Sequence, residues 1–158
     1  MGVEDPDGDR IQGLMVVLFL VVWGADSFVL NYSTFLVRFV PDLLRASLSV
    51  ISLATGGFLL LKSHTAVFSD ANIPPKLLDS GVYSRVRHPM YLGTLLVLFG
   101  FFLALPSLFS LAILTLFFIL YDRMATYEEK NLISIVGEEY ASYQRRVPKW
   151  LPRVISKK

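Results

Sequence analysis

The chain of 158 residues is 54% hydrophobic and 18% charged, with a mean hydropathy of +0.55. A soluble domain of this size carries more charge and fewer apolar residues, so the composition indicates an integral membrane protein. The lack of cysteine excludes disulfides, thiolate metal sites and cysteine nucleophiles. The net charge of +2 is too small to indicate a nucleic-acid partner.

Two apolar runs in the first half of the chain are long enough to cross a bilayer as helices. They cover about residues 11–31 and 42–62. Acidic residues precede the first run, unlike the basic start of a signal peptide, so we expect a retained span. Asp26 lies inside this span, either as a functional intramembrane carboxylate or as a solvated group near an interface.

The second half of the chain predicts a helical hairpin. Hydropathy falls over residues 63–88, where turn-forming residues favour a loop, and apolar spans follow at about 89–105 and 107–122. Each of these spans is about 24 Å long as a helix, which is short for a bilayer, so we expect them to be tilted or packed within the protein. The tail, residues 123–158, is charged and predicts an amphipathic helix that ends at Gly137.

These segments predict an all-α, polytopic membrane protein of one domain. It has about four transmembrane helices, including the C-terminal hairpin, and a cytoplasmic amphipathic helix. Short cytoplasmic segments are rich in Lys and Arg. With four spans, Arg38 and Arg45 fall on one side of the membrane and all other basic residues fall on the other. This asymmetry predicts that both termini, the loop and the tail face the cytoplasm.

The segment from Gly81 to Gly93 is a polar island between two apolar runs. It carries fixed positive charge and one titratable imidazole, His88. Pro89 suits the first turn of the next helix, whose free N–H groups point back at this segment. Such an arrangement favours an anion or a carboxylate as ligand. The returning hairpin brings Glu128 and Arg123 to the same membrane face.

The chain contains two linked motifs between about Leu77 and Pro152, nearly half of its length. Their residues are Gly81-Val82-Tyr83, Arg87-His88-Pro89-Met90-Tyr91-Leu92-Gly93, Glu128-Glu129, Leu132, Gly137-Glu138-Glu139-Tyr140, Tyr143, Arg146-Val147-Pro148 and Leu151-Pro152. Together they resemble the signature of the isoprenylcysteine carboxyl methyltransferase and phospholipid methyltransferase superfamily.

The resemblance implies a membrane-embedded methyltransferase that uses S-adenosylmethionine and takes a lipophilic substrate or membrane lipid from the cytoplasmic face. It implies catalytic roles for Arg123, Glu129 and His88. The family's acceptor arginine stands four residues before the first glutamate, where this chain has Met124, so Arg123 is the nearest candidate. The implied cofactor contacts, of which Pro75 and Lys76 match by position alone, are Pro75, Lys76, Leu77, Leu78, Tyr83, His88, Pro89, Met90, Tyr91 and Glu128.

Several alternatives stay open at this point. A prenylcysteine-type carboxylate is the first candidate acceptor and needs no general base, whereas a phospholipid amine would need His88 or Glu129 to take its proton. A small thiol is a further candidate. Two alternatives do not involve methyl transfer: the protein could be a nicotinamide-dependent membrane reductase or a non-catalytic membrane subunit. We expect no metal, because His64 is the sole second imidazole. We interpret Arg145, Arg146 and Lys149 as positive-inside anchors, with Trp150 at the membrane interface.

Overall fold

The computed structural model describes residues 6–68 and 77–152. Within them every regular element is helical, as the sequence predicts. The elements in chain order are α1 (Pro6–Gly24), the π-helical turn η1 (Ala25–Leu30), the 3-10 helix η2 (Thr34–Phe39), α2 (Asp42–Phe68), the 3-10 turn η3 (Gly81–Ser84), α3 (Pro89–Ala104), α4 (Leu108–Val136) and α5 (Glu138–Arg146).

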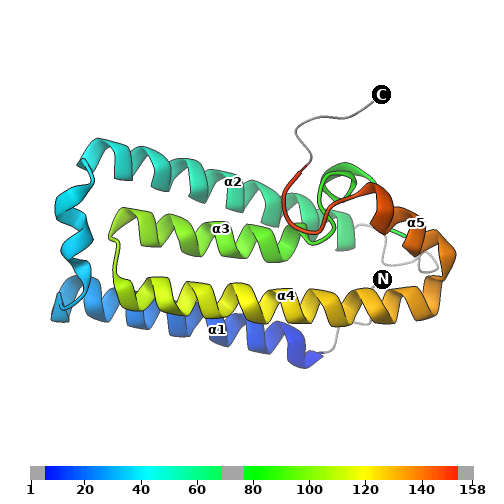
Figure 1. Ribbon diagram of the computed structural model, residues 1–158, viewed down its shortest axis with the longest axis horizontal. Coiled ribbons are helices and arrows are strands. Elements are labelled where there is room, and N and C mark those ends of the chain that lie inside the picture. The colour runs from blue at the N-terminus through cyan, green and yellow to red at the C-terminus, as the bar shows by residue number, and fades with distance from the viewer. Residues whose placement is uncertain (1–5, 69–76, 153–158) are drawn as a thin grey trace.

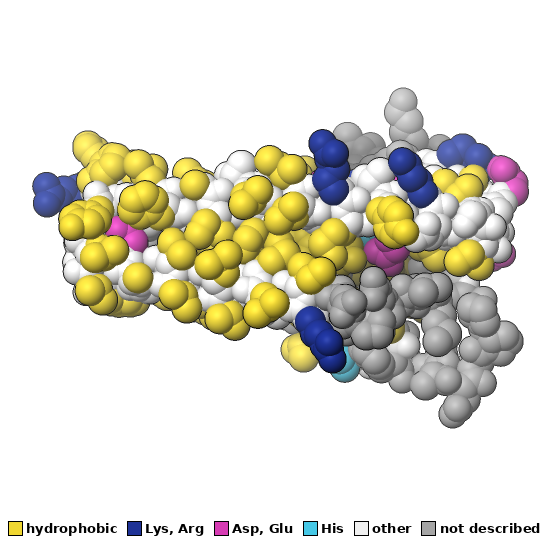
Figure 2. Space-filling model, turned by 90° about the horizontal axis from the view of Figure 1, so that it is seen from below, with side chains coloured by type: hydrophobic (Ala, Val, Ile, Leu, Met, Phe, Trp, Pro, Cys, Tyr) yellow, Lys and Arg dark blue, Asp and Glu magenta, His cyan; other side chains and the backbone are white. Residues whose placement is uncertain are grey.

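The four long helices lie side by side in one bundle, with α3 between α2 and α4, and α1 against α4 (Figure 1). Among the described residues, α1 with η1, α2 and α4 give three helices that are long and apolar enough to cross a membrane. α3 is a shorter apolar helix of 16 residues. Hydrophobic side chains cover the face shown in Figure 2 along most of its length. The protein is therefore an integral membrane protein.

Glycines bring α2 and α3 into close contact. A Cβ atom added at Gly56 would lie 2.7 Å from the carbonyl oxygen of Gly93, and one added at Gly100 would lie 2.7 Å from Cγ of Leu53. No real Cβ occupies such positions without a shift of its neighbours. Small residues at helix contacts allow backbones to approach in membranes, where van der Waals packing drives association. This packing holds the short helix α3 within the bundle, in line with the sequence prediction.

Serine hydroxyls reinforce the same contact between α2 and α3. Ser49 donates to the carbonyl oxygen of Gly100 at 2.8 Å, and Ser52 donates to that of Leu96 at 2.7 Å. Both serines are buried. Because lipid offers a polar group no partner, these interhelical bonds contribute both stability and register.

Asp26 anchors the end of the bundle that lies farthest from α5. Its side chain is 1% exposed and accepts hydrogen bonds from the hydroxyls of Ser33 at 2.5 Å and Ser107 at 2.6 Å. The backbone N–H groups of Tyr32 and Ser33 donate to its other oxygen at 3.1 and 3.3 Å. The alternative of a solvated Asp26 is therefore wrong, because four donors replace water around the carboxylate.

The same serines cap the start of α4. Ser33 accepts from the backbone N–H groups of Leu108 and Phe109, at its carbonyl and hydroxyl oxygens respectively. The hydroxyl of Ser107, the residue before the helix, accepts from the N–H of Ser110 at 3.3 Å. These bonds satisfy N–H groups that a helix start leaves without intrahelical partners.

α4 continues without a break from its apolar part into the charged tail and ends at Val136. Gly137 has φ of 72°, a backbone conformation that favours glycine, and it separates α4 from α5 as predicted. α5 then folds back beside the segment around η3 (Figure 1). Its contacts form a small apolar cluster of Tyr140, Tyr143 and Val147 with Leu77, Leu132 and Val136.

Candidate active site

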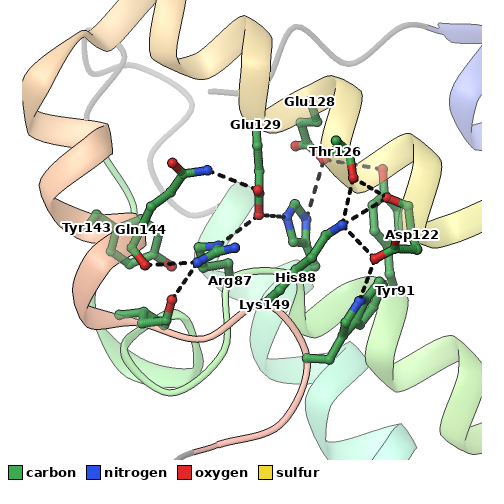
Figure 3. A network of polar contacts seen from close by, with 12 residues as sticks. Arg87, His88, Tyr91, Asp122, Thr126, Glu128, Glu129, Tyr143, Gln144 and Lys149 are labelled. Atoms are coloured by element: carbon green, nitrogen blue, oxygen red, sulfur yellow. Dashed lines mark hydrogen bonds and ion pairs between the residues drawn. The ribbon is translucent and has the colours of Figure 1, made fainter.

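A buried polar cluster lies where the start of α3 meets the C-terminal half of α4 (Figure 3). His88 immediately precedes α3, and Pro89 forms the first turn of that helix. The His88 Nε2 atom lies 2.9 Å from Oε1 of Glu129, and Arg87 Nε donates to the same oxygen at 2.8 Å. His88 and Glu129 are 6% and 8% exposed. The two motifs that the sequence singled out thus meet through a buried ion pair.

Arg87 also ties the C-terminal segment to this cluster. Its Nη1 atom donates to the carbonyl oxygens of Gln144 at 3.0 Å and Val147 at 2.7 Å, and its backbone N–H donates to the carbonyl oxygen of Pro148 at 3.0 Å. The side-chain amide of Gln144 donates to Oε2 of Glu129 at 2.9 Å. Both carboxylate oxygens of Glu129 are therefore bonded, and the charges of Arg87 and Glu129 compensate each other.

These bonds assign a role to the Nε2 atom of His88. A carboxylate paired with arginine only accepts, so Nε2 carries a proton and donates to Glu129. Nδ1 faces the other glutamate, with 3.6 Å to Oε2 of Glu128. The hydroxyl of Tyr91 points to the same oxygen at 3.4 Å. The Glu128 side chain is 39% exposed, so its carboxylate is accessible next to the imidazole.

Aromatic rings line one side of this position. The His88 ring stacks on Tyr91 with centroids 5.6 Å apart and planes inclined by 5°, and Tyr91 stacks on Tyr121 at 5.1 Å. The Trp150 ring centroid lies 6.1 Å from that of His88. The faces of such rings carry partial negative charge and attract cations. The accessible carboxylate of Glu128 therefore stands beside an aromatic wall that also favours positive charge.

A second set of bonds holds the chain after α5 against α4. The ammonium group of Lys149 donates to the carbonyl oxygen of Asp122 at 2.9 Å, to its Oδ1 at 2.6 Å and to the hydroxyl of Thr126 at 2.8 Å. The indole of Trp150 donates to the same carboxylate at 2.9 Å. Lys149 is thus an internal tether, which corrects its interpretation as a membrane-interface anchor: the side chain is 19% exposed and bonded to protein.

Two buried tyrosines of α5 complete the support of the cluster. The hydroxyl of Tyr143 donates to the carbonyl oxygen of Tyr83 at 2.7 Å. Burial raises the pKa of Tyr143 to about 12, although the nearby Arg87 guanidinium opposes the shift. Burial likewise raises the pKa of Tyr140, and the charge of Glu129 adds to that shift. The phenols thus stay protonated at neutral pH, and Tyr143 remains a hydrogen-bond donor to the motif segment.

Comparison with known proteins decides the family. The profile of the phospholipid methyltransferase family matches residues 45–139, more than half of the chain. The chain belongs to the phospholipid methyltransferase family. The match confirms the resemblance that the sequence motifs indicate, and it includes His88, Glu128 and Glu129.

Relatives of this chain carry names that point to different functions. The chain is 33% identical over 114 residues to the cobalt-zinc-cadmium resistance protein CzcN of Cupriavidus metallidurans. The aligned region covers 72% of this chain and 51% of that protein. It is 26% identical to the protein-S-isoprenylcysteine O-methyltransferase of Schizosaccharomyces pombe over 140 residues, covering 79% and 56%. It is 31% identical to a methanethiol S-methyltransferase of a Pseudomonas species over 165 residues, covering 96% and 49%. The chain spans about half the length of these relatives.

The structure brings together several of the residues that the family resemblance assigned. His88, Tyr91, Glu128 and Glu129 share the cluster, and the backbone of Tyr83 joins it through Tyr143. The other described positions surround it: Leu77 packs on α5, Pro89 is buried, and Leu78 and Met90 are half-buried. Pro75 and Lys76 lie outside the described residues.

Arg123 does not join this cluster. The buried stripe of α4 runs through Tyr121, Ala125 and Glu129 at intervals of four residues. Arg123 follows the first of these by two residues, which turns it about 200° around the helix. Its side chain is exposed. The family's acceptor arginine therefore has no counterpart among the described residues in contact with His88 or Glu128.

Gln144, Asp122 and Lys149 belong to the site or its support, although the sequence reasoning missed these roles. Each is a common surface residue in a charged tail, and each partner lies 15 or more positions away. The pairing depends on α5 folding back along α4. One signal for these roles was present in the sequence. The family signature continues past Gly137 into the polar tail, which indicates that the tail contacts the first motif.

Proposed function

We propose that the protein transfers a methyl group from S-adenosylmethionine to a lipophilic acceptor at the membrane face where His88 lies. One observation carries the proposal: His88 and Tyr91 at the start of α3 converge on the accessible carboxylate of Glu128 in α4, beside an aromatic wall. A chain of the phospholipid methyltransferase family that builds such a position has the means to hold a cationic methyl donor.

The described residues fit this cofactor. S-adenosylmethionine carries an ammonium and a sulfonium group, and Glu128 offers a carboxylate whose side chain is 39% exposed. The Tyr91 ring stacks on His88 beside this carboxylate, and a tyrosine ring favours a cation. Pro75 to Leu78 are proposed as further contacts on the basis of the family resemblance. When bound, the cofactor supplies a methyl group on a positively charged sulfur, which is already activated toward nucleophiles.

The residues of the cluster have separate tasks in this proposal. Methyl transfer requires chiefly alignment and exclusion of water. Glu129 is buried and holds Arg87, His88 and Gln144, so it acts as a positioning residue. His88 presents Nδ1 toward the accessible side, and this nitrogen accepts the proton of an amine or thiol acceptor. A carboxylate acceptor attacks in its ionised form and needs no such step.

The acceptor remains to be chosen among three classes. A prenylcysteine-type carboxylate has a precedent in the Schizosaccharomyces pombe relative, but it calls for a cation, and Arg123 lies on another face of α4. A small thiol needs no cation and has a precedent in the Pseudomonas relative, whose match covers 96% of this chain. A phospholipid amine is the third class. We retain the carboxylate as first candidate and rank the thiol next.

We further propose that the cluster faces the cytoplasm. The start of α1, the segment around η3 and the end of α4 lie at one end of the bundle (Figure 1). Arg38 in η2 and Arg45 in the first turn of α2 lie near the opposite end. Since Lys and Arg concentrate on cytoplasmic segments, the end with His88 and both termini is assigned to the cytoplasmic side.

Transfer of a labelled methyl group tests the proposal. Detergent-solubilised protein is incubated with methyl-labelled S-adenosylmethionine and, separately, with a prenylcysteine analogue, methanethiol and phosphatidylethanolamine. We expect one acceptor to become labelled, and we expect Glu128→Gln to reduce the rate at least about tenfold. Glu138→Gln is the matched control, because Glu138 is exposed and its ion pair with Arg145 is at the surface. Label in no acceptor would contradict the proposal, and equal loss in both variants would contradict the assignment of Glu128.

A further inference from the structure

The end of the bundle farthest from His88 contains a cavity of about 430 Å³. It is formed by η1, η2 and the turn between α3 and α4, and it is separate from the cluster proposed for methyl transfer (Figure 1). Its polar lining consists of Ser27, Asn31, Thr34 and Arg38, and its apolar lining of Phe35, Val37 and Leu105. The proposed methyltransferase reaction uses none of these residues.

Ser27 is a buried polar group without a partner. Its side chain is 8% exposed, and no described residue bonds to its hydroxyl. Asp26, its neighbour, is turned the other way and is saturated by Ser33, Ser107 and the backbone. A buried hydroxyl without a hydrogen bond costs about 1–3 kcal/mol in proteins. Ser27 lines the cavity, so rotation of its side chain about the Cα–Cβ bond would bring the hydroxyl to a ligand there as its missing partner.

The charge of the cavity selects an anion. Arg38 is the single charged residue of the lining, and no ion pair joins it to another described residue. The nearby Arg45 is already bonded to Asp42 and to the carbonyl oxygen of Ala104. A free guanidinium next to hydroxyl and amide groups matches a phosphate, whose oxygens accept several charge-assisted hydrogen bonds.

The surroundings of the cavity place it at the edge of the hydrocarbon layer. Tyr32 and Phe39 are 76% and 77% exposed, and Phe35 is 48% exposed. Exposed aromatic rings next to the end of a membrane span are typical of the interface between lipid tails and headgroups. Phospholipid phosphates lie at this depth, and the apolar lining of Phe35, Val37 and Leu105 suits the adjoining glycerol and acyl carbons.

The local backbone is also unusual. η1 is a π-helical turn at the end of α1, and Asn31, which lines the cavity, has φ of 53°. Turns of this type occur frequently at functional sites, and they open a helix where a side chain must be redirected. In this turn Asp26 bonds to Ser33 and Ser107, while Ser27 lines the cavity.

We propose that this cavity binds the phosphate-bearing headgroup of a phospholipid in the leaflet opposite to His88. Arg38 pairs with the phosphate, and Ser27, Asn31 and Thr34 supply hydrogen bonds. The site is independent of the methyl acceptor, because it lies at the other end of the bundle. Bound lipid would therefore stabilise the connection between α1 and α2 without being a substrate.

Native mass spectrometry of delipidated protein tests the site. The protein is titrated in detergent with phosphatidylglycerol and, in a separate arm, with inorganic phosphate. We expect one tightly retained phosphatidylglycerol and a Kd at least about tenfold weaker in Arg38→Gln, as expected for loss of a charge-assisted hydrogen bond. Lys130→Gln is the control, because Lys130 is exposed on the distant half of α4, and its Kd is expected to be unchanged.

Ser27→Ala provides the second variant. We expect several-fold weaker lipid binding and no loss of thermal stability in the delipidated protein, because the hydroxyl has no described partner to lose. Equal lipid retention by wild type, Arg38→Gln and Ser27→Ala would overturn the proposal, as would no retained lipid in the wild type. Binding of inorganic phosphate without retention of lipid would overturn the headgroup assignment in favour of a free anion.

Discussion

Replacing Glu129 with glutamine tests whether the buried ion pair holds the two motifs together. Glu129 accepts from Arg87, His88 and Gln144, and the Arg87 and Glu129 side chains are 13% and 10% exposed. Glutamine has nearly the same shape but leaves the Arg87 charge without its carboxylate. Removing one member of a buried ion pair costs about 3–5 kcal/mol, so we expect the free energy of unfolding to fall by about that amount.

Glu138→Gln is the matched control for this measurement. Glu138 also pairs with an arginine, Arg145, but the two side chains are 81% and 64% exposed. Ion pairs that remain in water contribute little, typically under about 1 kcal/mol. Unfolding of both variants is followed by titration with sodium dodecyl sulfate in mixed micelles. A Glu129→Gln variant that is no less stable than Glu138→Gln would refute the reasoning.

Three further predictions concern packing, the C-terminal segment and pH. Gly56→Ala should destabilise the bundle by about 1–3 kcal/mol through overpacking against α3. Gly57→Ala is the control and should not destabilise it, because a Cβ added at Gly57 has no neighbouring atom within 4 Å. Equal effects of both variants in the same titration would exclude close packing as the cause. Lys149→Met should remove three hydrogen bonds and speed chymotrypsin cleavage after Trp150, and an unchanged cleavage rate would argue against a tether. The raised pKa of Tyr143 means that its stabilising effect is complete below pH 10 and lost as pH rises through about 12. Absorbance titration of wild type against Tyr143→Phe should show the missing phenol titrating near 12, and titration near 10 would contradict its burial.

Much of the fold follows from local pattern. Apolar runs, the break at Pro106 and Ser107 and the glycine at position 137 mark the helices, because length and turn chemistry act over a few residues. The continuous course of α4 differs from the prediction of a short span at 107–122 followed by a separate tail, because the helical periodicity of residues 123–136 continues that of the span. The close contact of α2 with α3 could not be predicted in the same way, since Gly56 and Gly93 become informative only when paired.

The residues of the site that belong to the two family motifs could be predicted from the sequence. His88 and Glu128 were identified because the family signature and the hairpin place both on one membrane face. The bonds of Gln144 to Glu129 depend on how α5 folds back, and a polar residue in a charged tail gives no sign of that. The hydrogen bonds of Asp26 could not be predicted for the same reason, since its partner Ser107 lies 81 residues away in sequence.

Equilibrium binding of S-adenosylmethionine tests the central claim most directly. Isothermal titration of detergent-solubilised wild-type protein should give saturable binding. Glu128→Gln should weaken it by about tenfold or more, since a charge-assisted contact to the ammonium or sulfonium is lost. Glu138→Gln should bind as wild type does. No detectable binding to folded wild-type protein, or equal binding by Glu128→Gln, would contradict a cofactor site at the cluster of His88, Tyr91 and Glu128.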